Sequence, residues 1–211
     1  MFSSVFDQLL ASNLFELIGF ISGLLCVWLL IRQSIWTWPI GLVYTLVSLF
    51  VFFEAKLYSE FGLHIYYAVM NAYGWYYWSR VGAAETGEGK TSVPVTSVNI
   101  KTLYLLIGIT LVSIPALAAL MSHFTDADMV YADATITILS FVAMWMTARK
   151  FIESWYVWLL VDVIATVVYV IKGIELYAVL YCVYIVMAVM GWAAWRKTLT
   201  KSALDIEQAA I

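Results

Sequence analysis

Residues 149–197 read RKFIESWYVWLLVDVIATVVYVIKGIELYAVLYCVYIVMAVMGWAAWRK, and they contain two long apolar runs separated by Lys172 and Gly173. The first run covers about 154–171 and the second about 175–195. A helix needs roughly 20 mostly apolar residues to cross the hydrocarbon core of a bilayer. Each run meets this requirement, so the stretch predicts two membrane-spanning helices joined by a short turn.

Five more apolar runs lie upstream, at about 14–31, 36–53, 60–79, 103–121 and 130–148. Of the 211 residues, 64% are apolar and 12% are charged, whereas an average soluble domain is about half apolar and a quarter charged. A chain of this length cannot bury so much apolar surface in its own interior, so the surplus must face lipid. The sequence therefore predicts an all-α membrane protein with seven transmembrane helices, whose main partner is the lipid bilayer.

The segments outside the spans have simpler compositions. Residues 1–13 are expected to form a short amphipathic segment at the membrane surface. Residues 80–102 are rich in Gly, Ser, Thr and charge, which is typical of a loop, and residues 196–211 are expected to form a tail. The net charge of -3 indicates no nucleic-acid partner, and the two cysteines, Cys26 and Cys182, suggest no disulfide framework.

The distribution of Lys and Arg predicts the orientation of the chain. Nine of the eleven fall in alternate loops, at Arg32; at Arg80, Lys90 and Lys101; at Arg149 and Lys150; and at Arg196, Lys197 and Lys201. The opposite side receives only Lys56 and Lys172. Because positive loops stay in the cytoplasm, the N-terminus is expected outside and the C-terminus inside.

An internal repeat appears when the sequence is shifted by 117 residues. Residues 32–80 then align with 149–197 without a gap, and Gly74-Trp75-x-x-Trp78 meets Gly191-Trp192-x-x-Trp195. The repeat unit is three helices, 14–79 and 130–195, and the helix at 103–121 links them so that both units keep the same orientation. Parallel repeats of this kind are a known transporter architecture, with substrate held between the halves.

Motifs of common enzymes are missing. The sequence contains no H-E-x-x-H, no G-x-S-x-G and no phosphate-binding P-loop. The two histidines, His64 and His123, are far apart, and no lysine stands near the centre of a span as a retinal Schiff base would need. The sequence therefore predicts a protein that is not an enzyme and that holds neither a cofactor nor a metal.

Polar and aromatic residues within the spans are the candidate substrate site. Trp155 and Trp158 are three residues apart and share a helix face, and a pair of tryptophans can sandwich a planar ring, a cationic one best. Intramembrane polar groups such as Asp162 are costly and therefore point to function. The candidate substrate-binding residues are Trp36, Trp38, His64, Tyr67, Asn71, Trp155, Trp158, Asp162, Tyr181 and Tyr184.

Structural interpretations compete with this one. The tryptophans could form an aromatic belt at the membrane interfaces. The stripe of His64, Tyr67 and Asn71, together with Asp162, could instead form hydrogen bonds that hold the helices together. Asp133 and Asp162 could also carry protons, although the sparse buried charge favours a facilitator over an ion-coupled pump.

The motifs resemble those of the PnuC family of vitamin transporters over most of the chain from Ile31 to Lys197. In the first half, Trp36-x-Trp38-Pro39-Ile40-Gly41, residues 52–58 (FFEAKLY) and Tyr73-Gly74-Trp75-Tyr76-x-Trp78 carry the likeness. In the second half, it is carried by 133–137 (DATIT), by Arg149-Lys150-x-x-Glu153-x-Trp155-x-x-Trp158-x-x-x-Asp162, by Lys172-Gly173 and by 187–191 (MAVMG).

The resemblance implies a 3+1+3 bundle like that of a full-length SWEET sugar transporter, a homotrimer in the bacterial inner membrane. It also implies facilitated diffusion of an unphosphorylated B vitamin, which a cytoplasmic vitamin kinase then traps. Nicotinamide riboside is the expected substrate, carried by alternating access. Thiamine is the alternative, since both are flat cations, and a membrane receptor or scaffold without transport is an alternative of another class.

Overall fold

The computed structural model describes residues 14–54, 58–81, 93–124 and 129–209. The surface segment predicted for 1–13 and the central part of the loop predicted for 80–102 lie outside these ranges. The described part is helical, with α2 (Leu14–Ile31), α3 (Thr37–Glu54), α4 (Tyr58–Tyr76) and its π-helical continuation η1 (Tyr77–Val81), α6 (Ile100–Phe124), α7 (Val130–Ala148), α8 (Ser154–Ile171) and α9 (Glu175–Ala209).

Most helix boundaries agree with the apolar runs. The predicted spans at 14–31, 130–148 and 154–171 coincide with α2, α7 and α8. The main difference is α9, which was expected to end near 195 but continues to Ala209. Residues 196–209 contain no Gly or Pro and many strong helix formers, so nothing ends the helix where the apolar run stops.

Several helices of the described chain are suited to a bilayer. By length and apolar composition α6, α7, α8 and the Glu175–Lys201 part of α9 can each cross a membrane, and Phe20–Ile31 and Thr37–Phe50 are shorter apolar helical stretches. Side chains on α6 such as Leu105, Leu111 and Val112 are more than 60% exposed. A helix with so much exposed apolar surface is stable only against lipid or another protein. The chain is therefore a multi-pass membrane protein.

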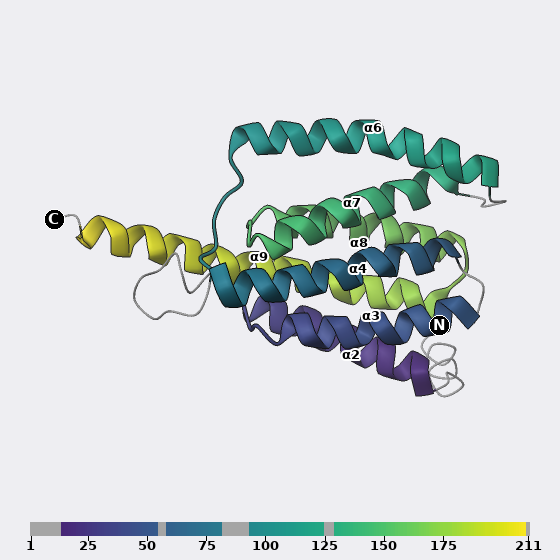
Figure 1. The fold of residues 1–211 in the computed structure, drawn as a ribbon, viewed down its shortest axis with the longest axis horizontal. Coiled ribbons are helices and arrows are strands. Elements are labelled where there is room, and N and C mark those ends of the chain that lie inside the picture. Colours follow the sequence, from purple (N-terminus) through teal and green to yellow (C-terminus); the bar gives the residue numbers. More distant parts are fainter. Residues whose placement is uncertain (1–13, 55–57, 82–92, 125–128, 210–211) are drawn as a thin grey trace.

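The helices run roughly along one long axis (Figure 1). The helices α2, α3 and α4 pack together as a first group, and α7, α8 and α9 pack together as a second group. Contacts of α4 with α7 and of α2 with α9 join the groups, and α6 lies against α7 at the edge of the bundle. The end that carries Arg32, Arg80, Arg149 and Arg196 is called the basic end below.

Tryptophan–glycine contacts near the basic end occur in both groups. The Trp38 ring lies on Gly74, and the Trp155 ring lies on Gly191, where in each case a methyl group would collide with ring carbons. The Trp38 ring meets Trp78 edge-on at 5.2 Å and 86°, and the Trp155 ring meets Trp195 at 5.4 Å and 89°. The members of each matching pair are 117 residues apart, as the sequence repeat requires.

Candidate functional site

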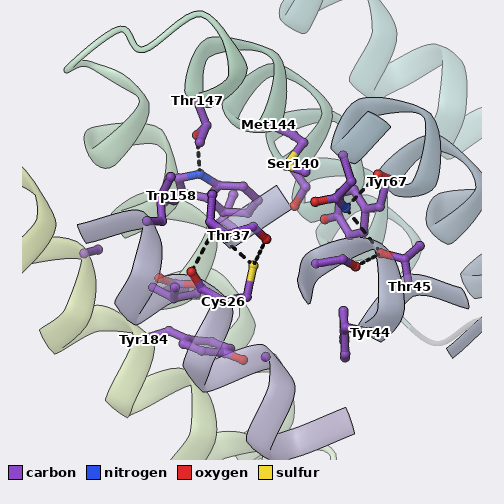
Figure 2. A pocket seen from close by; sticks show the side chains of 18 of the residues that line it. Cys26, Thr37, Tyr44, Thr45, Tyr67, Ser140, Met144, Thr147, Trp158 and Tyr184 are labelled. Atoms are coloured by element: carbon purple, nitrogen blue, oxygen red, sulfur yellow. Dashed lines mark hydrogen bonds between the residues drawn. The ribbon is translucent and has the colours of Figure 1, made fainter. Parts of the chain in front are cut away.

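A cavity of about 210 Å³ lies between the two helix groups (Figure 2). Both groups contribute to its wall, so it is formed where substrate sites lie in helical bundles. Its lining residues are Gly23, Cys26, Val27, Leu30, Thr37, Trp38, Gly41, Tyr44, Thr45, Tyr67, Asn71, Ser140, Met144, Thr147, Trp155, Trp158, Val161, Asp162, Tyr181, Tyr184 and Ala188.

The second group supplies an aromatic face and a carboxyl group. Trp155, Trp158 and Asp162 stand at i, i+3 and i+7 on α8, so one helix face carries all three to the cavity. The Trp158 Nε1 donates a hydrogen bond of 3.0 Å to Thr147 Oγ1 on α7, which fixes the plane of the indole ring. A ring held in this way is a ready surface for stacking a planar ligand.

Asp162 is the one acidic or basic side chain among the described residues that line the cavity. Asp162 is 5% exposed, and its carboxyl group forms no ion pair within the described part of the chain. A carboxylate removed from water is costly unless a positive charge or hydrogen bonds compensate it. The cavity is therefore suited electrostatically to a cation.

The first group supplies a polar face. The Asn71 Nδ2 donates to the Tyr67 carbonyl oxygen at 2.8 Å and to Thr45 Oγ1 at 3.3 Å, which leaves the amide oxygen on the side of Gly41. A side chain at position 41 would collide with this oxygen, so the glycine is required for the amide to occupy its place. The amide oxygen is an acceptor that a ligand hydroxyl can use.

The tyrosines line the side of the cavity that faces away from the basic end. The ring of Tyr181 is edge-on to Tyr184 at 5.7 Å and stacks on Tyr169 at 5.3 Å. Tyr169 also stacks on Tyr177 at 5.3 Å, farther from the basic end. The cavity is thus bounded by tyrosines on one side and by Trp38 and Trp155 on the other.

Eight of the ten candidate residues from the sequence line the cavity: Trp38, Tyr67, Asn71, Trp155, Trp158, Asp162, Tyr181 and Tyr184. Trp36 does not, because it precedes the first turn of α3, where its side chain is 64% exposed. His64 is buried outside the lining, with its ring 6.0 Å from that of Tyr44 and 5.5 Å from that of Tyr67. Asp133, considered as a proton carrier, instead pairs with Lys172 at 3.4 Å.

Several lining residues were not singled out from the sequence. Thr147 positions Trp158, and Gly41 and Thr45 position Asn71. The repeat held a signal for two of them, because the shift of 117 residues aligns Gly41 with Trp158 and Thr45 with Asp162. Positions that match a candidate in the other half are natural candidates themselves.

Comparisons with known proteins find relatives of the chain over most of its length. Residues 13–197 match the family model described as nicotinamide mononucleotide transporter. The chain is 26% identical over 200 residues to the nicotinamide riboside transporter PnuC of Escherichia coli, covering 85% of this chain and 84% of that protein. It is 30% identical over 192 residues to the riboflavin/roseoflavin transporter RibM of Streptomyces davaonensis, covering 90% and 87%.

The fold is also that of a solved transporter. The crystal structure of the vitamin B3 transporter PnuC matches with a TM-score of 0.69 and 18% identity, over 87% of this chain and 81% of that one. The family model covers far more than half of the chain, and the matched region includes every residue that lines the cavity. The chain is a member of the nicotinamide mononucleotide transporter family, in which PnuC and RibM are vitamin transporters.

Proposed function

We propose that the chain carries nicotinamide riboside, or a closely similar cationic vitamin, across the bacterial inner membrane by facilitated diffusion. The observation that carries the proposal is the pairing of a positioned indole, Trp158, with a buried carboxylate, Asp162, on one wall of the cavity. An aromatic cation would stack on the first and be neutralised by the second. The uncharged first-group wall would receive the hydroxylated part of the molecule.

The proposed architecture is two like-oriented three-helix units joined by α6, with the N-terminus in the periplasm and the C-terminus in the cytoplasm. The matching Trp38–Trp78 and Trp155–Trp195 pairs support the repeat. A further match is the left-handed backbone at Gln33, with φ 55°, and 117 residues later at Lys150, with φ 59°. The excess of Lys and Arg at the basic end supports the orientation.

Alternating access would move one unit against the other around the central cavity. We propose that the functional form is a homotrimer and that a cytoplasmic kinase traps the imported vitamin, as the resemblance implies. Thiamine is the alternative substrate, since it too is a flat cation. Flavins are uncharged, so the Asp162 carboxylate favours a cationic vitamin over the substrate named for RibM.

The test of this function is uptake into proteoliposomes that contain the purified protein. Labelled nicotinamide riboside should enter faster than into empty liposomes, and competition with unlabelled thiamine ranks the two substrates. Collapsing the proton gradient should leave the initial rate unchanged, because facilitated diffusion needs no coupling ion. Uptake no faster than into empty liposomes would leave the receptor or scaffold as the better description.

Replacement of Trp158 by alanine should weaken substrate binding about tenfold, because stacking of a planar ring on an indole contributes about 1–2 kcal/mol. Isothermal titration of the purified protein measures the effect. The matched control is Trp36→Ala, which removes an exposed indole outside the cavity and should leave affinity unchanged. Equal affinities of the two variants would assign Trp158 to the aromatic belt at the membrane interface instead of the substrate site.

A further inference from the structure

A layer of four tryptophans separates the cavity from the basic end. This layer, called the plug below, consists of Trp38, Trp78, Trp155 and Trp195, each no more than 2% exposed. Trp38 and Trp155 also line the cavity, and the Trp78 and Trp195 rings lie 6.4 Å apart between the two helix groups. A substrate that leaves through the basic end must displace this layer.

Hydrogen bonds of the plug cross from one helix group to the other. The Trp78 Nε1 of η1 donates to the Ala148 carbonyl oxygen of α7 at 3.0 Å. The Trp195 Nε1 of α9 donates to the Leu30 carbonyl oxygen of α2 at 3.1 Å. Each group therefore holds the other through one indole, and both bonds must break when the groups separate at this end.

Lys150 adds a cation to one of these two junctions. Its side chain is fully buried, with the Nζ atom 4.4 Å from the centroid of the Trp78 ring and 2.7 Å from the Val93 carbonyl oxygen that accepts its hydrogen bond. Burial lowers the pKa of Lys150 to about 8, so the ammonium form still predominates at neutral pH. At the matching position, Gln33 offers only a neutral amide, which donates to Thr198 Oγ1 at 2.9 Å.

The segment 93–99 is bonded to the α7–α8 turn of the second group, which contains Lys150. Thr96 and Phe151 form a parallel β-bridge, in which the Thr96 N–H donates to the Lys150 carbonyl oxygen at 3.2 Å and the Ile152 N–H to the Thr96 carbonyl oxygen at 3.0 Å. The Val98 N–H donates to Glu153 Oε2 at 3.0 Å. The segment and the α7–α8 turn thus form one unit, and the Lys150 ammonium of this unit contacts the Trp78 ring of the first group.

The plug also contains two buried indole N–H groups that make no hydrogen bond in the described chain. The Nε1 atoms of Trp38 and Trp155 are buried and have no hydrogen-bond partner in the described chain. An unmade buried hydrogen bond is costly, and a movement that brings water or a ligand to these atoms would remove the cost. The plug is therefore held closed at Trp78 and Trp195 while Trp38 and Trp155 would gain from opening.

We propose that Lys150 is a positioning residue of a gate at the basic end, whose ammonium group holds the Trp78 ring in the plug and so favours the state closed on that side. The proposal rests on the proposed transport function, because a gate has a purpose only in a transporter. Removing the cation, with the rest of the side chain kept, should shift the population toward the state open at the basic end.

Cys26 provides the measurement, because its thiol lines the cavity behind the plug. In a Cys182→Ser background, a membrane-impermeant maleimide is added to the ligand-free protein in vesicles of either orientation. Lys150→Met should be labelled about tenfold faster than the parent from the basic end, and at the parent rate from the other end. Lys150→Arg retains a cation over the ring and should be labelled at close to the parent rate.

Equal labelling of Lys150→Met and the parent from the basic end would overturn the proposal. So would acceleration from both ends, since that indicates general loosening of the bundle. If Lys150→Met does not fold, Lys150→Gln removes the cation, keeps a donor for the Val93 carbonyl oxygen, and should give the same one-sided acceleration. The labelling needs no vitamin, so a failed uptake experiment would reject the transport function without deciding the accessibility result.

Discussion

Replacement of Asp162 by asparagine is expected to weaken binding of nicotinamide riboside by about 2–4 kcal/mol, or roughly 30- to 1,000-fold. The substitution keeps the size of the side chain and removes the one charge among the described lining residues. A buried cation would then face a neutral amide, tyrosine hydroxyls and indole rings, none of which replaces a carboxylate in a medium of low dielectric constant. Isothermal titration and proteoliposome uptake both measure the loss.

A neutral ligand of similar shape distinguishes the contribution of charge to the binding affinity from the contribution of shape. Dihydronicotinamide riboside keeps the ribose and the ring but lacks the positive charge. The parent protein should prefer the cation strongly, and Asp162→Asn should bind the two ligands with nearly equal affinity. Asp133→Asn is the matched control, because it removes a carboxylate that pairs with Lys172 outside the cavity. Retained preference for the cation in Asp162→Asn would assign the carboxylate to helix packing instead.

The helices could be predicted from the sequence because the signal is local. An apolar run of the required length predicts a span wherever it occurs, and α2, α7 and α8 begin and end where the runs do. The end of α9 could not be found in this way, since the apolar run stops at the membrane surface but the helix does not. Residues 196–209 keep helical propensity after the hydropathy signal has ended.

The lining of the cavity was predictable in part, because the spacing of residues shows which of them share a helix face but not how deeply each side chain is buried. Trp155, Trp158 and Asp162 share a face by their spacing, and that face borders the cavity. Trp36 and Trp38 are two residues apart and looked equivalent, yet one is 64% exposed and the other 2%. Their difference depends on Gly74, which receives the Trp38 ring from another helix, and a single sequence does not show that contact.

Glycines in the bundle illustrate the same distinction between local and tertiary information. Gly41, Gly74 and Gly191 have neighbours that a methyl group would strike, whereas Gly62 and Gly108 have none within 4 Å. All are helical glycines, so helix propensity treats them alike. Only the packing of the folded chain distinguishes those that position side chains of the cavity from those that do not.

Gly191→Ala is expected to destabilise the protein by about 3 kcal/mol, because its Cβ would collide with three carbons of the Trp155 ring and the interior has no room to move the ring away. Trp155 is 2% exposed and lies edge-on against Trp195, so displacing it disturbs the plug and the cavity together. The melting temperature in detergent should fall by roughly 6–12 °C.

Gly108→Ala on α6 is the matched control, since it makes the same change in a membrane helix where nothing lies within 4 Å of the new methyl group. It should leave stability unchanged or raise it by about 0.5–1 kcal/mol through better helix propensity. Gly74→Ala should resemble Gly191→Ala, because the Trp38 ring occupies the matching place. If Gly191→Ala has the same melting temperature as the control, the tryptophan–glycine contacts do not fix the wall of the cavity. The separation of the site from the basic end then depends on the hydrogen bonds of Trp78 and Trp195 instead.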